Sequence, residues 1–128
     1  MDEGLNRKTP KGTGTDLTTQ TKDFAIRVIR LVSSLPKSAP AQTMGKQLLR
    51  SGTSVGMHYR DSIRVRSDAE FIEKMELAVR ELENSLYWME LLVESEMVPH
   101  PRLHDLMTEA GRLVAVFNAC VKNVRSRG

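Results

Sequence analysis

The stretch SDAEFIEKMELAVRELENSLYWMELL, residues 67–92, carries the clearest structural signal in the chain. Ser67 stands before it as a helix N-cap, and Glu70 follows three residues later, which is the spacing of a capping box. Two columns of apolar or small residues then recur at helical spacing. The first column is Phe71, Met75, Ala78, Leu82, Ser85, Met89 and Leu92, and the second is Ile72, Val79, Leu86 and Val93. A stripe this broad predicts a long helix in the core of a helical bundle.

Three more helices are expected around this one. Asp16 or Thr18 caps the first, whose apolar residues recur at helical spacing at Phe24, Val28, Leu31, Val32 and Leu35. Pro36 and Pro40 bracket the break that follows it. The second covers residues 41–65. The last begins at Pro101, because proline is well suited to the first position of a helix. Its apolar residues recur at the same three-and-four spacing, at Leu103, Leu106, Ala110, Leu113, Phe117, Cys120 and Val124.

The pattern as a whole predicts an all-α protein. No stretch alternates with a period of two, so no strand is expected. Four helices with short connections normally pack antiparallel, in up-down-up-down order. We therefore expect residues 17–128 to form one four-helix bundle of this kind. Residues 1–16 are polar, rich in Gly and Thr, and without apolar periodicity, so we expect them to be a disordered N-terminal arm.

The helix predicted over residues 41–65 contains three glycines, Gly45, Gly52 and Gly56. Each disfavours a helix by roughly 1 kcal/mol relative to alanine. Close approach of a neighbouring backbone is the usual compensation, because glycine has no Cβ. This helix should therefore lie where the packing is tightest.

Composition narrows the class of protein. The 128 residues include a single cysteine, which excludes an internal disulfide framework. There is no long apolar run and no basic segment followed by an apolar one, so we expect a cytoplasmic protein that does not enter a membrane. The net charge of +3 and the pI near 9.2 are compatible with nucleic-acid binding and equally with its absence.

The stretch from Gln47 to Leu92, QLLRSGTSVGMHYRDSIRVRSDAEFIEKMELAVRELENSLYWMELL, resembles the four-helix-bundle proteins associated with 23S ribosomal RNA intervening sequences. The blocks RSGTSVG and LYWMELL carry the resemblance, which extends more weakly over residues 20–125. It implies a bundle that assembles into a ring, a homopentamer, in a bacterial cytoplasm. Related bundles are accessory proteins of retroelement reverse transcriptases and bind nucleic acid through a basic surface. His58 and Asp61 depart from the family pattern, where Asn and Glu are usual.

A polar strip runs beside the apolar stripe of the helix predicted over residues 41–65. It consists of Gln47, Ser51, Ser54, His58 and Asp61. Three of these have the residue types of a hydrolase triad, but the interior of a helix offers no free N–H groups for an oxyanion hole. We interpret the strip as a partly buried polar network between helices, with no catalytic residue.

Charge is segregated along the chain. Residues 67–97 hold nine acids against two basic residues, a net of −7, so that the rest of the +3 chain carries +10. Lys46, Arg60 and Arg64 share the face opposite the core of their helix, and Arg50 borders that face. These four are the candidate nucleic-acid-binding residues. Two other interpretations remain open, namely a solvated surface and the pairing of acidic with basic faces between subunits.

Leu77, Trp88 and Leu91 lie off the main apolar face of their helix. A tryptophan with a leucine three residues on is typical of an anchor in a protein interface. These three residues are therefore the candidate oligomer interface, and a wider intramolecular core is the alternative.

The sequence offers no set of residues suited to a cofactor or metal. His100 and His104 are four residues apart, but no third ligand has a fixed position beside them. The leading hypothesis is a non-enzymatic homo-oligomeric scaffold without a small-molecule substrate. It would bind RNA or DNA, or a reverse transcriptase or other nucleic-acid enzyme. The alternative is an oligomeric scaffold that binds only proteins.

Overall fold

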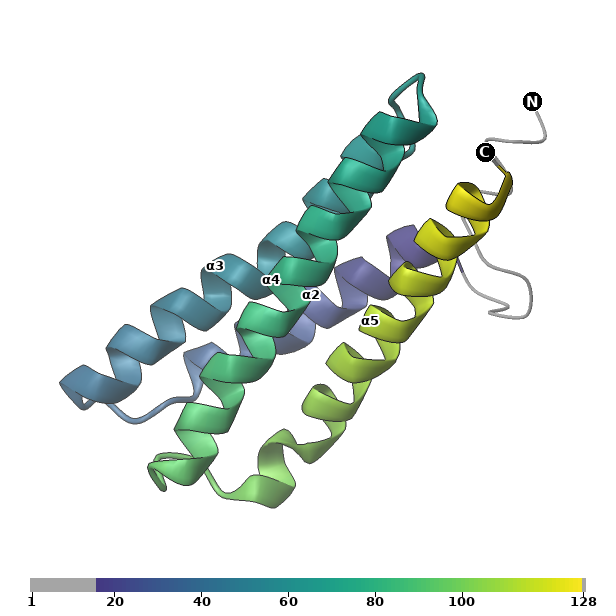
Figure 1. Ribbon diagram of the computed structural model, residues 1–128. Helices are drawn as coiled ribbons and strands as arrows, with labels where there is room; N and C mark the ends of the chain where they lie inside the picture. The colour runs from purple at the N-terminus through teal and green to yellow at the C-terminus, as the bar shows by residue number, and fades with distance from the viewer. Residues whose placement is uncertain (1–15, 128) are drawn as a thin grey trace.

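The computed structural model describes residues 16–127, which form four helices and no strand (Figure 1). The all-α prediction is confirmed for these residues. The arm expected over residues 1–16 lies outside them except for Asp16, the N-cap residue of the first helix. The helices are α2 (Leu17–Ser33), α3 (Ala39–Ser62), α4 (Asp68–Glu94) and α5 (His100–Arg127). None of them is long and apolar enough to cross a membrane.

Two serines begin α3 and α4. The Ser67 hydroxyl accepts a hydrogen bond of 3.1 Å from the Glu70 amide, so the predicted N-cap is present. The Glu70 side chain reaches back as expected of a capping box, but it accepts from the Ser67 hydroxyl, at 3.0 Å. Helix α3 begins two residues earlier than predicted, because Ser38 caps it through the Ala41 amide and Pro40 lies within its first turn. A proline fits there because the first amides of a helix have no intrahelical acceptor.

Helix α4 ends without the glycine that usually marks such a terminus. Glu96 takes a left-handed conformation with φ of 62°. Its amide donates to Val93 at 2.9 Å, and the Met97 amide donates to Leu92 at 3.0 Å. These two bonds form a Schellman motif, which satisfies the last carbonyls of the helix. Helix α4 therefore ends at Glu94, and a short connection leads to α5 at His100.

One hydrophobic core joins the four helices. All seven residues of the first column predicted in α4 are buried, and so are all seven predicted in α5. The four largest fully buried side chains are Tyr59, Phe24, Phe71 and Phe117. The Tyr59 and Phe117 rings, from α3 and α5, lie 5.9 Å apart between centroids. The core thus holds α5 against α3 as well as against α4.

The three glycines of α3 face α2. A Cβ atom at Gly52 would lie 2.8 Å from Cγ2 of Val28, and one at Gly45 would lie 2.7 Å from Cδ1 of Leu35. At Gly56 the nearest atom is Oγ1 of Thr21, at 3.1 Å. The predicted close approach is therefore present. Side chains of α2 and its following turn fill most of the space, and backbone is among the nearest atoms only at Gly56, where Thr21 comes within 4.0 Å.

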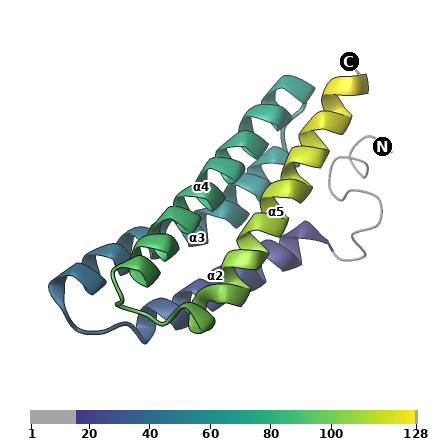
Figure 2. The same cartoon turned by 60° about the horizontal axis from the view of Figure 1, so that its bottom comes forward.

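The two sides of α2 are packed differently. It makes far fewer contacts with α5 than with α3. Figure 2 shows α2 crossing α5 at an angle, whereas α3 and α4 run side by side. We call these two contacts the α2–α3 seam and the α2–α5 seam. Polar side chains bridge the second seam, where Arg112 donates to Gln20 and Arg102 donates to Ser34.

Candidate functional site

The four candidate nucleic-acid-binding cations lie on or just after α3. Lys46, Arg50 and Arg64 are exposed and Arg60 is half-buried. None of the four forms an ion pair with another residue in the range 16–127. They do not form one cluster, because Arg60 lines a groove beside Lys22 of α2 whereas Arg50 faces α4.

Arg50 lies in a polar pocket of about 150 Å³ between α3 and α4. This pocket brings together residues that the sequence assigned to three separate roles: Arg50 as a cation, Gln47 and Ser51 as network residues, and Trp88 as an interface residue. Glu81 and Asn84 of α4 complete its lining. The sequence pattern does not indicate these two residues, because the register between two helices depends on how their side chains pack.

A pair of buried hydroxyls links α3 to α4. Ser51 and Ser85 lie 2.8 Å apart between their Oγ atoms. Each hydroxyl also lies near a carbonyl of its own helix, Ser51 at 3.2 Å from Leu48 and Ser85 at 2.9 Å from Glu81, so that one hydroxyl donates to its carbonyl while the other donates to its partner hydroxyl. This pairing satisfies both groups inside the core, where an unpaired hydroxyl would be costly.

The other members of the polar strip are less closely connected. The Ser54 hydroxyl donates to the Ser51 carbonyl at 3.0 Å, within its own helix. His58 Nε2 lies 3.9 Å from Oε2 of Glu81 on α4. Gln47 and Asp61 are exposed. Among the described residues, no hydrogen bond joins Ser54 to His58 or His58 to Asp61, so the strip is not arranged as a triad.

Two other potentially reactive features lie elsewhere on α5. The rings of His100 and His104 meet edge to face with centroids 5.3 Å apart. Within residues 16–127, no group of three or more His, Cys, Asp or Glu side chains is placed to hold a metal ion. Cys120 is buried, and burial raises the pKa of its thiol to about 11. The thiol therefore stays protonated near neutral pH and packs as a small apolar group.

The candidate interface residues are partly covered by the chain itself. Leu77, Trp88 and Leu91 are half-buried, and Trp88 packs against the core. Its neighbour Tyr87 is 54% exposed, and the two rings meet with centroids 5.3 Å apart. Three further apolar residues are exposed and were not among the predicted interface residues, namely Ile26, Ile29 and Met57. The sequence signal that could have found them is an apolar residue on the side of a helix opposite its buried stripe.

Much of the charge on α5 is paired within the chain. Arg125 reaches Glu76 of α4 at 2.9 Å, and Arg127 lies 3.9 Å from Asp68. Arg112 bonds to Glu109 at 2.7 Å, and this bond raises the pKa of its guanidinium. Exposed pairs of this kind contribute little to stability, about 0–1 kcal/mol each. The lysines and arginines of α2 and α3, by contrast, form no ion pair among residues 16–127.

Comparisons with known proteins agree with the fold. The family model described as "23S rRNA-intervening sequence protein" matches residues 15–119. A crystal structure of a protein of unknown function from the S23 ribosomal protein family of Bacteroides thetaiotaomicron is 28% identical. It aligns over 82% of this chain and 94% of its own, with a TM-score of 0.77. A comparison with curated proteins finds no match. The chain therefore belongs to the 23S rRNA-intervening sequence protein family.

Proposed function

We propose that this protein is a non-enzymatic, homo-oligomeric scaffold that binds nucleic acid through four cations on or just after α3. We call these cations, Lys46, Arg50, Arg60 and Arg64, the basic surface of α3. The observation that carries the proposal is that Lys46, Arg50, Arg60 and Arg64 have no acidic partner among residues 16–127. Cations left free at a surface attract phosphates and release their counterions, which is the main source of non-specific affinity for nucleic acid. Binding should therefore depend on charge and show little sequence preference.

The proposal includes an antiparallel up-down-up-down course of the helices. Two sets of contacts support it. Ser62, the last residue of α3, donates to the sulfur of Met75 in the first half of α4 at 3.4 Å. Arg125, near the end of α5, pairs with Glu76 in the same part of α4. Both contacts bring the end of one helix to the beginning of its neighbour.

Assembly into a closed ring, a homopentamer, completes the proposed scaffold. The exposed Tyr87 beside the half-buried Trp88 offers an aromatic surface for subunit contact. Symmetry would repeat the basic surface of α3 around the ring, and repeated weak contacts with one strand add to a stronger total affinity. We place this ring in a bacterial cytoplasm, bound to RNA or DNA or to a nucleic-acid enzyme such as a reverse transcriptase.

The test is the salt dependence of binding. The full chain is titrated into labelled single-stranded and duplex oligonucleotides at several salt concentrations. Replacing Lys46, Arg60 and Arg64 together by glutamine should weaken binding. Each lost phosphate contact should also flatten the slope of log affinity against log salt by about 0.7 for single strands and about 0.9 for duplex.

The matched control replaces Lys37, Lys74 and Lys122 by glutamine. It removes the same net charge from positions outside α3 and should keep most of the affinity and slope. Equal losses in the two triple variants would mean that net charge, and not the α3 surface, controls binding. Absence of binding to any oligonucleotide at low salt would rule out the nucleic-acid function.

The second candidate function is a scaffold that binds only proteins, and the Tyr87–Trp88 aromatic pair favours it. Light scattering of the parent should give a particle several times the 14.4 kDa chain mass. Tyr87→Asp should shift it toward monomer. Tyr87 is preferred to Trp88 for this test because Trp88 also packs against the core. A parent that remains monomeric at micromolar concentration would exclude both forms of scaffold.

A further inference from the structure

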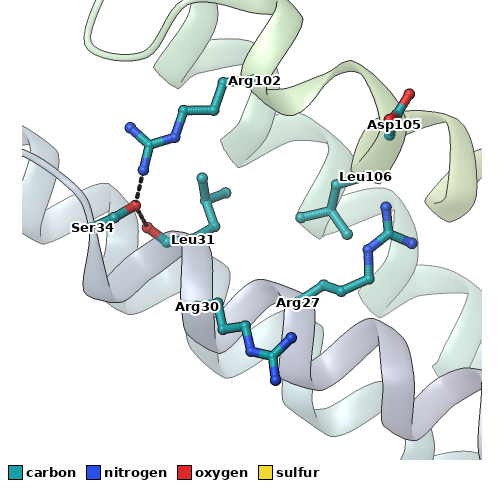
Figure 3. A pocket seen from close by; sticks show the side chains of 7 residues that line it. All are labelled: Arg27, Arg30, Leu31, Ser34, Arg102, Asp105 and Leu106. Carbon is teal, nitrogen blue, oxygen red and sulfur yellow. Dashed lines mark hydrogen bonds between the residues drawn. The ribbon is translucent and has the colours of Figure 1, made fainter.

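A second pocket lies on the α2–α5 seam, where α2 ends and α5 begins. It has a volume of about 360 Å³. Arg27 and Arg30 of α2 and Arg102 of the first turn of α5 line it. Figure 3 shows the apolar side chains of Leu31 and Leu106 between Arg102 on one side and Arg27 on the other. The pocket therefore combines an apolar floor with a rim of guanidinium groups.

The arginines of this pocket form no ion pair with a described residue. Asp105 is the one acid in the lining, so the lining carries +2, and Asp105 forms no ion pair with a described residue. Arg27 and Arg30 likewise form no ion pair within residues 16–127. Arg102 donates only to the Ser34 hydroxyl, which is neutral and itself donates to the Leu31 carbonyl at 2.7 Å.

At the other end of the α2–α5 seam, by contrast, the arginine has an acidic partner. There Arg112 is neutralised by Glu109 and also donates to Gln20 across the seam. Three arginines line this pocket without such a partner, so their like charges repel one another. An anion that enters between them removes this repulsion and receives several charge-assisted hydrogen bonds.

We propose that this pocket binds a phosphate monoester. The planar guanidinium matches the oxygens of a phosphate in bidentate fashion. A monoester carries a charge of about −1.5 to −2 near pH 7, which balances the +2 of the lining. Leu31 and Leu106 provide apolar contact for the sugar or base that carries the phosphate. The ligand is therefore a free nucleoside monophosphate or the 5′-phosphorylated end of a strand.

The experiment measures binding of three probes to the full chain by calorimetry: inorganic phosphate, adenosine 5′-monophosphate, and one short oligonucleotide with either a 5′-phosphate or a 5′-hydroxyl. The monophosphate should bind more tightly than inorganic phosphate, because only the monophosphate contacts the apolar floor. A preference of about tenfold or more for the 5′-phosphorylated oligonucleotide identifies strand ends as the source. Equal affinity for the two oligonucleotides with retained monophosphate binding identifies the free nucleotide.

The double variant Arg27→Gln, Arg30→Gln should lose monophosphate affinity by at least about tenfold, since each lost charge-assisted bond weakens binding by roughly that factor. It should also fold normally, because neither side chain has a hydrogen bond or ion pair with a described residue. Arg66→Gln is the control, because it removes an exposed arginine from the α3–α4 connection. Full affinity in the double variant, or no monophosphate binding by the parent at millimolar concentration, would overturn the proposal.

This test is independent of the basic surface of α3. The triple variant at Lys46, Arg60 and Arg64 should keep its monophosphate affinity, because none of those residues lines the pocket. Loss of strand binding with retained monophosphate binding would separate the two surfaces. Loss of monophosphate binding in that variant would show that the α3 cations, and not this pocket, hold the phosphate.

Discussion

The α2–α3 seam and the α2–α5 seam differ in what holds them together. In the first, α3 presents three glycines to α2, and Val28, Leu35 and Thr21 occupy the space that larger side chains would need. In the second, long polar side chains reach across, and arginines from both helices line an open pocket. One helix thus has a closely packed apolar side and a loosely packed charged side.

This contrast separates the stabilising part of the fold from the part available for binding. Dispersion attraction requires atoms in contact, so the closely packed α2–α3 seam stabilises the pairing of the two helices. The same close packing leaves little space there for a ligand. The α2–α5 seam has fewer contacts between its helices than the α2–α3 seam, and most of its arginines are exposed. A ligand can enter there without breaking the core.

The largest expected effect concerns how α5 is held. Because α5 meets α2 only loosely, its attachment depends on core side chains such as Phe117, which is fully buried beside Tyr59. Phe117→Ala should lower the free energy of unfolding by about 3–5 kcal/mol. Urea denaturation followed by circular dichroism measures this loss. An unchanged midpoint would mean that α5 is not held by the core as described.

An intermediate effect tests the tight seam. Gly52→Ala places a Cβ atom 2.8 Å from Val28, which is fully buried and has a stiff β-branched side chain. Overpacking costs about 1–3 kcal/mol, which should exceed the gain of roughly 1 kcal/mol in helix propensity. Thermal unfolding should therefore occur at a lower temperature than in the parent.

Gly111 provides the matched control for this substitution. It is exposed on α5, and no atom lies within 4 Å of where its Cβ would be. Gly111→Ala should raise stability by about 1 kcal/mol, because only the propensity gain applies. If both substitutions stabilise the protein equally, the α2–α3 seam has more space than the structure indicates.

The smallest effect belongs to the open seam. Arg112→Gln removes the ion pair with Glu109 and the hydrogen bond to Gln20, which an exposed arginine makes to two half-buried partners. The expected loss is below about 1 kcal/mol, and added salt should reduce it further. Measuring denaturation at low and high salt checks both points. A loss as large as that of Phe117→Ala would show that the α2–α5 seam is not loosely held.

Much of the fold could be predicted from local sequence. The column from Phe71 to Leu92 is buried as predicted, because helical periodicity alone determines which residues share a face. The Ser67 cap was predictable for a similar reason, since its partner Glu70 is three residues away. The end of α4 could not be predicted from the sequence. Glu96 adopts a left-handed conformation there, which non-glycine residues rarely take and which its residue type does not indicate.

The candidate sites show the same difference between features that local sequence predicts and features that depend on contacts between helices. The sequence by itself determined which residues are cationic, which serines and aromatics lie near the core, and that α3 needs a closely packed neighbour. Only the tertiary structure decided that Ser51 meets Ser85, that Arg50 and Trp88 line one pocket, and that Arg27, Arg30 and Arg102 line another. The physical reason is that periodicity acts within one helix. Contacts between helices depend on the register and crossing angle set by the packing of all side chains together.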